Sequence, residues 1–99
     1  MDHGWLHLEA RYNYEAIRTG TGIWDLFSTC KYEVTGPDAT RLIQRRFTNS
    51  LAGMADGAVR YGAFVNADGT MVDDGNVYRF SDDRYWELIN SAGFEDWFN

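Results

Sequence analysis

The chain has one cysteine, one proline and no long apolar run, and each scarcity excludes a class of protein. A single thiol, Cys30, cannot build an internal disulfide framework, which favours a reducing compartment and a cytoplasmic location. The lone proline excludes a proline-rich linker. No apolar segment approaches the ~20 residues of a membrane span, and residues 1–12 lack the basic and apolar regions of a signal peptide. We therefore expect no membrane association.

Positive charge is also scarce. Nine Lys and Arg stand against 15 Asp and Glu, which gives a formal net charge of −6. Proteins that follow a phosphate backbone need clustered cations. The nearest approach is Arg41, Arg45 and Arg46, and the helical spacing of the first two is typical of a solvated face. Nucleic acid is not an expected partner.

The apolar pattern predicts an α+β fold with a mostly antiparallel sheet and flanking helices. Hydrophobic residues form 44% of the chain, enough for a core in one small domain or in a piece of a larger one. In the first half of the chain we expect a helix over 8–19, short strands over 23–27 and 31–35, and a helix that starts at 36–38 and presents Ala39, Leu42, Ile43 and Phe47 on its apolar face. In the second half we expect a three-strand meander over 59–65, 71–80 and 85–90, with a turn at 66–69. Residues 93–98 are then expected to open another helix.

Two adjacent acids, Asp73 and Asp74, lie inside the second strand of that meander. Acids are depleted in strands, and successive residues point to opposite faces. One interpretation is a solvated edge strand with one acid facing water. The other is a site in which an acid lies on a sheet face beside Tyr61, Tyr78 and Asn90. Such an acid holds a proton near a substrate amine or accepts hydrogen bonds from a planar heterocycle, between aromatic walls.

Three other patterns give weaker signals. His3 and His7 have the spacing of two metal ligands on a helix, but no Glu-His motif accompanies them, so we expect solvated histidines and no metal site. Cys30 lacks the partners of a nucleophile and is typical of a small buried thiol. The Gly20-Thr21-Gly22 segment follows a helix, whereas a dinucleotide fingerprint follows a strand.

Several short motifs, taken together and in order, resemble the glycine-cleavage T-protein (aminomethyltransferase) superfamily. They are Gly22-Ile23-Trp24-Asp25-Leu26, the run from Tyr32 to Ala39, Thr48-Asn49, Asn66-Ala67-Asp68-Gly69, Val72-Asp73-Asp74, Val77-Tyr78-Arg79 and Asn90-Ser91-Ala92. The resemblance implies a three-domain fold around a central tetrahydrofolate cavity. It implies transfer of a one-carbon unit between folate and a small methylated or aminomethyl substrate, with a carrier protein or an oligomer as a possible partner.

The same resemblance assigns roles to the acid-bearing strands. It implies that Asp74 lies against the reactive pterin nitrogens and orients the substrate, and that Tyr61, Tyr78 and Asn90 line the folate pocket. It further implies that residues 1–30 begin the first folate-binding domain, with a helix and an edge strand. Residues 31–99 would then form a second α+β segment that contains the meander. On this interpretation the chain is an N-terminal fragment whose remainder is missing, and it is inactive alone.

Two departures from the family pattern leave alternatives open. Leu26-Phe27-Ser28-Thr29-Cys30 stands where T-proteins carry a Val-Ser-His-Met-Gly type run, which disfavours the glycine-cleavage reaction itself. Gly75-Asn76 replaces the usual apolar residues after the acid pair. A folate-dependent demethylase, or the folate domain of a sarcosine or dimethylglycine type enzyme, fits equally well. The runner-up is a non-catalytic folate-binding or iron–sulfur assembly module, and a third possibility is a truncated product that acts at most as an interaction surface.

Overall fold

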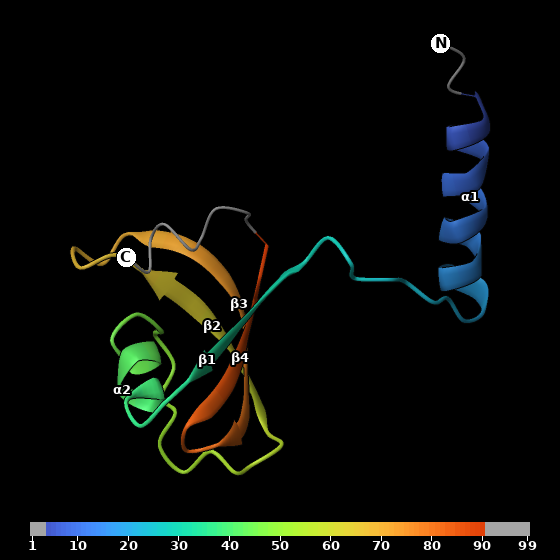
Figure 1. Cartoon of the computed structure of the whole chain (residues 1–99). Helices are drawn as coiled ribbons and strands as arrows, with labels where there is room; N and C mark the ends of the chain where they lie inside the picture. Colours follow the sequence, from blue (N-terminus) through green and yellow to red (C-terminus); the bar gives the residue numbers. More distant parts are fainter. Residues whose placement is uncertain (1–3, 91–99) are drawn as a thin grey trace.

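The computed structural model describes residues 4–90 and confirms the α+β class. Within these residues two helices and four strands follow one another (Figure 1): α1 Gly4–Thr19, β1 Cys30–Thr35, α2 Ala39–Gln44, β2 Val59–Val65, β3 Met71–Ser81 and β4 Arg84–Ile89. The expected meander is present as β2, β3 and β4, each within a residue or two of its predicted bounds.

The four strands form one antiparallel sheet in the order β1-β4-β3-β2. β1 pairs with the distant β4, from Cys30 opposite Ile89 to Thr35 opposite Arg84. β3 and β4 are therefore interior strands, whereas β1 and β2 form the edges. This order contradicts the interpretation of the acid-bearing strand as an edge strand, because β3 has a hydrogen-bonded partner on both sides.

The turn between β2 and β3 forms where the sequence predicts it. Gly69 has a φ of 85°, a conformation that side chains disfavour. Asp68 stabilises the turn, because its Oδ1 accepts the backbone N–H of Thr70 at 3.0 Å and the Thr70 hydroxyl at 2.6 Å. This turn fixes the register that brings β2 alongside β3.

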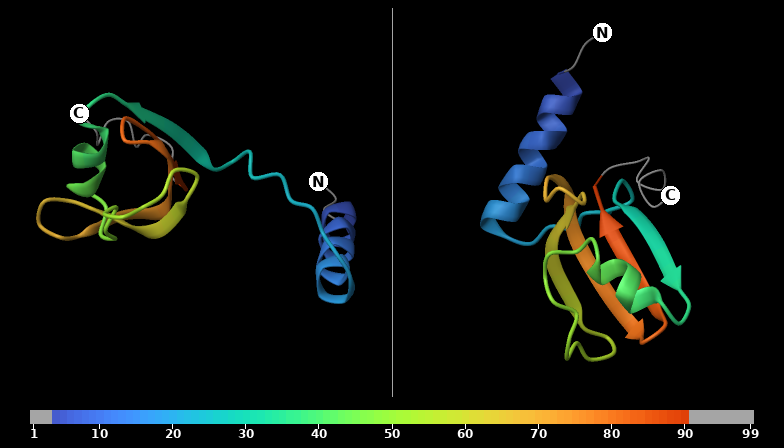
Figure 2. Two further views of the ribbon diagram at one scale, coloured as in Figure 1. Left: turned by 90° about the horizontal axis from the view of Figure 1, so that it is seen from below. Right: turned by 90° about the vertical axis from the view of Figure 1, so that its left-hand side faces the viewer.

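The core lies between α2 and one face of the sheet (Figure 2). Its buried hydrophobic residues are Ala39, Ile43, Phe47, Leu51, Met54, Phe64, Val77, Tyr85 and Ile89. Of the four residues predicted to form the apolar stripe, Ala39, Ile43 and Phe47 are buried. The prediction is wrong for Leu42, which remains 42% exposed. The helix ends at Gln44, and Phe47 reaches the core through a bridge to Phe64.

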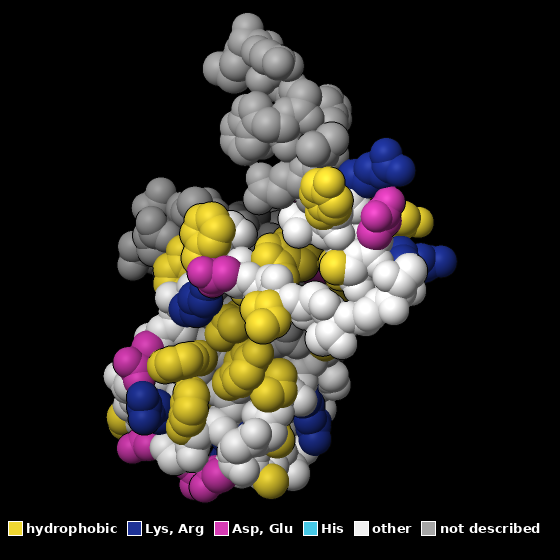
Figure 3. All heavy atoms as spheres, turned by 90° about the vertical axis from the view of Figure 1, so that its right-hand side faces the viewer, with side chains coloured by type: hydrophobic (Ala, Val, Ile, Leu, Met, Phe, Trp, Pro, Cys, Tyr) yellow, Lys and Arg dark blue, Asp and Glu magenta, His cyan; other side chains and the backbone are white. Residues whose placement is uncertain are grey.

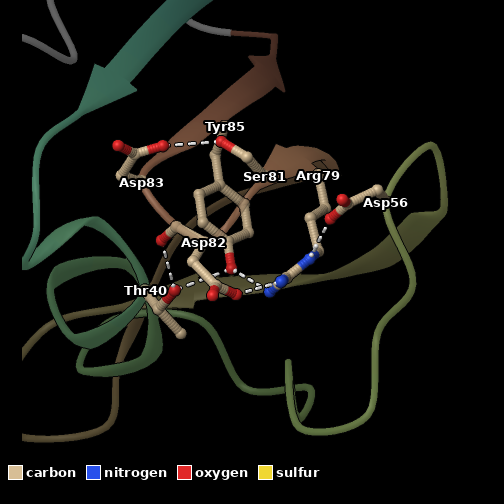
Figure 4. A network of polar contacts seen from close by, with 7 residues as sticks. All are labelled: Thr40, Asp56, Arg79, Ser81, Asp82, Asp83 and Tyr85. Carbon is tan, nitrogen blue, oxygen red and sulfur yellow. Dashed lines mark hydrogen bonds and ion pairs between the residues drawn. The ribbon is translucent and has the colours of Figure 1, made fainter.

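A polar network joins α2 to the β3–β4 hairpin (Figure 4). The Thr40 hydroxyl donates to the Asp82 carbonyl at 3.0 Å, so the 2.7 Å bond between Thr40 and Tyr85 takes its proton from the tyrosine. Tyr85 in turn accepts from Arg79 Nη1 at 2.9 Å. Arg79 also donates to Asp56 at 2.9 Å and to Asp82. The network therefore ties together the helix, the hairpin and the loop that contains Asp56.

The segment before β1 departs from the prediction. Residues 20–29 form no strand, so the short strand expected over 23–27 is wrong. Alternation alone does not make a strand, because the ladder needs a neighbour, and Ile23 and Trp24 remain largely exposed. These residues instead run as an extended connection to α1, which stands apart from the sheet (Figures 1 and 2). The helix expected over 93–98 and His3 lie outside the described residues.

Candidate functional site

The sheet face opposite α2 carries the candidate site. Figure 3 views the molecule from the side away from α2 and shows hydrophobic side chains gathered there. Strand alternation places Tyr61 and Trp86 on this face, and they are 62% and 38% exposed. The same alternation separates the two acids of β3. Asp73 is buried, at 8% exposure, whereas Asp74 belongs to the open face and is half-buried.

Strand register brings the predicted residues together. Tyr61 on β2 is opposite Asn76 on β3, and this pairing places Tyr61 diagonally next to Asp74. Ile89 on β4 is opposite Gly75, so Asn90 follows directly beside Asp74. Tyr78 lies four residues along β3 from Asp74, on the same face of the strand.

Asp74 has hydrogen-bond donors from both neighbouring strands. The Tyr61 hydroxyl donates to Asp74 Oδ2, and Asn90 Nδ2 donates to Asp74 Oδ1 at 2.9 Å. Asn90 Nδ2 also approaches the Asp74 backbone oxygen at 3.2 Å. The bond to Asp74 is the main reason that the pKa of Tyr61 is raised above its ordinary value, with burial and the negative charge of Asp74 adding to it. The carboxylate is thus held by one donor on each side.

A hollow of about 290 Å³ lies over this group. It is lined by Leu26, Thr29, Tyr61, Asp74, Gly75, Asn76, Tyr78, Leu88 and Asn90. All four sequence-predicted site residues are present. Sequence reasoning missed Leu26 and Thr29, which come from the extended connection and carry no periodic signal. It also missed the wall residue Leu88.

Gly75 shapes the floor of the hollow. A Cβ built on it would meet the Leu88 carbonyl oxygen at 1.9 Å, so the close approach of β3 to β4 requires glycine. Gly75 and Asn76, which depart from the family pattern, both line the hollow.

Asp73 anchors the same region from inside the sheet. Its Oδ1 accepts the Asp74 backbone N–H at 2.8 Å and Asn90 Nδ2 at 3.2 Å, while its Oδ2 accepts the Asn90 backbone N–H at 3.1 Å. Sequence reasoning singled out the acid pair but assigned a role only to its second member. The signal that could have identified Asp73 is the rarity of an acid on the buried face of a central strand.

A second ionisable pair lies on the covered face of the sheet. Glu87 on β4 is fully buried and accepts from Arg46 Nη2 at 3.4 Å. Burial raises the pKa of Glu87 to about 7, and the charge of Arg46 only partly opposes this. Burial also lowers the pKa of Arg46. Since Glu87 is inaccessible, we assign it to the core and not to the site.

Two other hollows within residues 4–90 are larger than the one over Asp74. One, of about 580 Å³, lies between α1 and the residues that follow it, and no ionisable side chain lines it. The other, of about 330 Å³, lies at the end of β1 and along α2, and its lining includes Asp38, Arg41 and Arg45 but no aromatic side chain. No group of three or more His, Cys, Asp or Glu side chains converges in the described region in a way that could bind a metal ion. None of the described helices has both the length and the apolar character needed to cross a bilayer.

Comparison with known proteins gives one consistent family. The model of the GCVT N-terminal domain matches residues 5–99. An aminomethyltransferase of Symbiobacterium thermophilum is 38% identical over 85 residues, covering 85% of this chain and 23% of that protein. The aminomethyltransferase of Bacillus subtilis is 33% identical over 82 residues, covering 83% of the chain and 23% of that protein. The chain therefore spans less than a quarter of the length of these relatives.

A solved structure shows the same fold. The glycine cleavage system aminomethyltransferase T of Bartonella henselae superposes with a TM-score of 0.62 at 24% identity, over 73% of this chain and 20% of that one. At this identity the match bears on the fold alone. Together with the family model and the relatives, it confirms the resemblance seen in the sequence.

Proposed function

The chain belongs to the family of the GCVT N-terminal domain, and from this membership we propose that its open sheet face forms part of a tetrahydrofolate site in a one-carbon transferase. The observation that carries the proposal is the convergence of Asp74, Tyr61, Tyr78 and Asn90 on one hollow. Because the chain spans less than a quarter of its relatives, we assign the transfer itself to a longer protein that contains it.

The residues of the hollow fit a planar heterocycle. Asp74 presents a half-buried carboxylate, which accepts hydrogen bonds from ring and amino N–H groups, and Tyr61 and Tyr78 supply aromatic walls. When bound, tetrahydrofolate would supply the nitrogens that accept or give up the one-carbon unit. The part of this chain is to hold the ring, orient it and place a fixed negative charge beside it. No covalent bond to the protein is required.

The connection before β1 bears on which substrate is used. Leu26 and Thr29 line the hollow, and both belong to the run that departs from the glycine-cleavage pattern. We therefore favour a family member that acts on another small methylated or aminomethyl substrate. A folate-dependent demethylase satisfies the same geometry. A non-catalytic folate-binding or assembly module is the alternative class.

Replacement of Asp74 separates the two classes. In the longest natural protein that carries these residues, Asp74→Asn should lower kcat by about 10²-fold or more if the carboxylate acts in the transfer. Asp68→Asn is the matched control, since within residues 4–90 Asp68 accepts hydrogen bonds from Thr70 in its own turn, and the Oδ1 of asparagine can accept the same bonds. Unchanged turnover or phenotype in Asp74→Asn would instead indicate a binding module. The 99-residue chain alone should show no folate-dependent turnover, and measurable turnover would refute the assignment to a longer protein.

A further inference from the structure

Asp73 forms hydrogen bonds both to the backbone of Asp74 and to Asn90, the residue that donates to the Asp74 carboxylate. It accepts the backbone N–H of Asp74 at 2.8 Å, the backbone N–H of Asn90 at 3.1 Å and the side-chain Nδ2 of Asn90 at 3.2 Å. A carboxylate has enough lone pairs for these three bonds. At 8% exposure, Asp73 is turned away from the hollow and is not among its lining residues.

Asn90 needs this support because of its place in the sheet. It comes directly after Ile89, the last residue of β4 to pair with β3. Beyond that pair the ladder no longer fixes the backbone. The two bonds to Asp73 replace the ladder, one holding the Asn90 backbone and the other its side chain.

The side-chain amide of Asn90 lies between two like charges. Its Nδ2 donates to Asp73 Oδ1 and to Asp74 Oδ1, at 3.2 and 2.9 Å. Only the amino end of the amide can serve two acceptors, so the orientation of Asn90 follows from the two acids. Charge-assisted bonds to both carboxylates also offset the repulsion between them.

We propose that Asp73 is a positioning residue, which aims the Asp74 carboxylate into the hollow through Asn90 and through the Asp74 amide without touching the ligand. The effect of Asp73 on folate binding rests on the proposed function, whereas its effect on the orientation of Asp74 is independent of that function. The pKa of Tyr61 is sensitive to the orientation of the Asp74 carboxylate, because the Tyr61 hydroxyl donates a hydrogen bond to Asp74 Oδ2.

The first readout is the titration of Tyr61 in chain labelled with ¹³C-tyrosine, with Tyr61→Phe assigning the resonance. In Asp73→Asn an amide NH₂ group replaces one carboxylate oxygen, so that one of the N–H groups of Asp74 or Asn90 faces a donor and loses its acceptor. The pKa of Tyr61 should then fall toward its ordinary value. The titration is made in 1 M salt, where the Debye length is ~3 Å, so that loss of the Asp73 charge at a distance contributes little. Asp68→Asn is the control and should leave Tyr61 unchanged.

The second readout is hydrogen exchange at the Asn90 side-chain amide. Loss of one hydrogen bond to a charged partner should speed this exchange by about tenfold in Asp73→Asn. A folded Asp73→Asn chain with wild-type Tyr61 titration and wild-type Asn90 exchange would overturn the proposal. If Asp73→Asn does not fold, Asp73→Glu decides, because it keeps the charge but lengthens the side chain by one methylene and so displaces the carboxylate from the N–H groups of Asn90 and Asp74. It should lower the pKa of Tyr61 and speed the exchange of the Asn90 side-chain amide, and wild-type values of both would also overturn the proposal.

Ligand binding is tested separately with 5-formyltetrahydrofolate as the probe. Chemical-shift titration should show affinity at least about tenfold weaker for Asp73→Asn than for the wild-type chain. Equal affinity in the two would overturn the positioning role toward the ligand. Absence of binding by the wild-type chain would count against the proposed function, and the Tyr61 and Asn90 readouts would still decide whether Asp73 positions Asp74.

Discussion

Tyr61 donates its hydroxyl proton to Asp74 across the β2–β3 pair, from a position diagonal to it in the register. The two residues lie 13 apart in the sequence, and the turn at Gly69 brings them together. This bond links the edge strand to the acid that the proposed function places nearest the folate ring. It also makes Tyr61 a measurable reporter of the site.

Asp74→Asn should lower the pKa of Tyr61 toward its ordinary value, because the bond to Asp74 is the largest cause of the raised pKa. In the wild-type chain the neutral phenol is favoured by folding, so this contribution is present below the ordinary tyrosine pKa and is lost as pH rises through the raised one. The measurement is the ¹³C titration of the Tyr61 ring. Asp68→Asn should have no effect, and a wild-type titration in Asp74→Asn would show that the bond does not form in solution.

The buried pair of Arg46 and Glu87 predicts an unusual pH dependence of stability. Because the pKa of Glu87 is raised to about 7 from 4.5, the folded chain binds a proton that the unfolded chain releases. The stabilisation is complete below about pH 4.5 and is lost as pH rises through about 7. Its size is on the order of 3 kcal/mol. Urea unfolding across this range should therefore show stability falling with pH.

Glu87→Gln should remove that slope, since glutamine does not titrate. Glu33→Gln is the control: Glu33 is an exposed carboxyl whose pKa is lowered, chiefly by its hydrogen bond to Arg84. It should leave the slope in place. Stability that is flat or rises between pH 4.5 and 7 in the wild-type chain would contradict the assignment of Glu87 as a buried acid with a raised pKa.

Arg79 should be a larger contributor to stability than Arg84. Arg79 is 16% exposed at its side chain and binds Asp56, Asp82 and Tyr85, whereas the side chain of Arg84 is 49% exposed and pairs with Glu33. We expect Arg79→Met to lower the free energy of unfolding more than Arg84→Met does, because Arg79 has the less exposed side chain and more hydrogen-bond partners. Denaturant unfolding of both variants measures the difference. Similar losses would mean that the network in Figure 4 adds no more than a surface ion pair.

The meander could be predicted from the sequence because its signals are local. Alternation in β2, the turn at 66–69 and the acid pair in β3 all lie within one short stretch, and Tyr61, Asp74, Tyr78 and Asn90 fall on it. The structure brings these four together, and their roles toward folate remain predictions.

The rest of the site depends on long-range pairing. That β1 lies beside β4, which makes β4 an interior strand, is not encoded in any local pattern. Asp73 is paired with Phe64 on the core face of the sheet, so its burial follows from tertiary packing. The presence of Leu26 in the hollow follows from the path of an irregular connection. The strand predicted over 23–27 failed for the same reason, because an apolar run becomes a strand only where a neighbour accepts its hydrogen bonds.

The most direct test is an NMR titration of the ¹⁵N-labelled chain with 5-formyltetrahydrofolate, repeated with Asp74→Asn and with Asp68→Asn. The account predicts shifts concentrated at Tyr61, Asp74, Tyr78 and Asn90 in the wild-type chain and in Asp68→Asn, and their loss in Asp74→Asn. Shifts that are absent, that lie elsewhere on the chain, or that persist unchanged in Asp74→Asn would contradict the claim that this sheet face binds folate through Asp74.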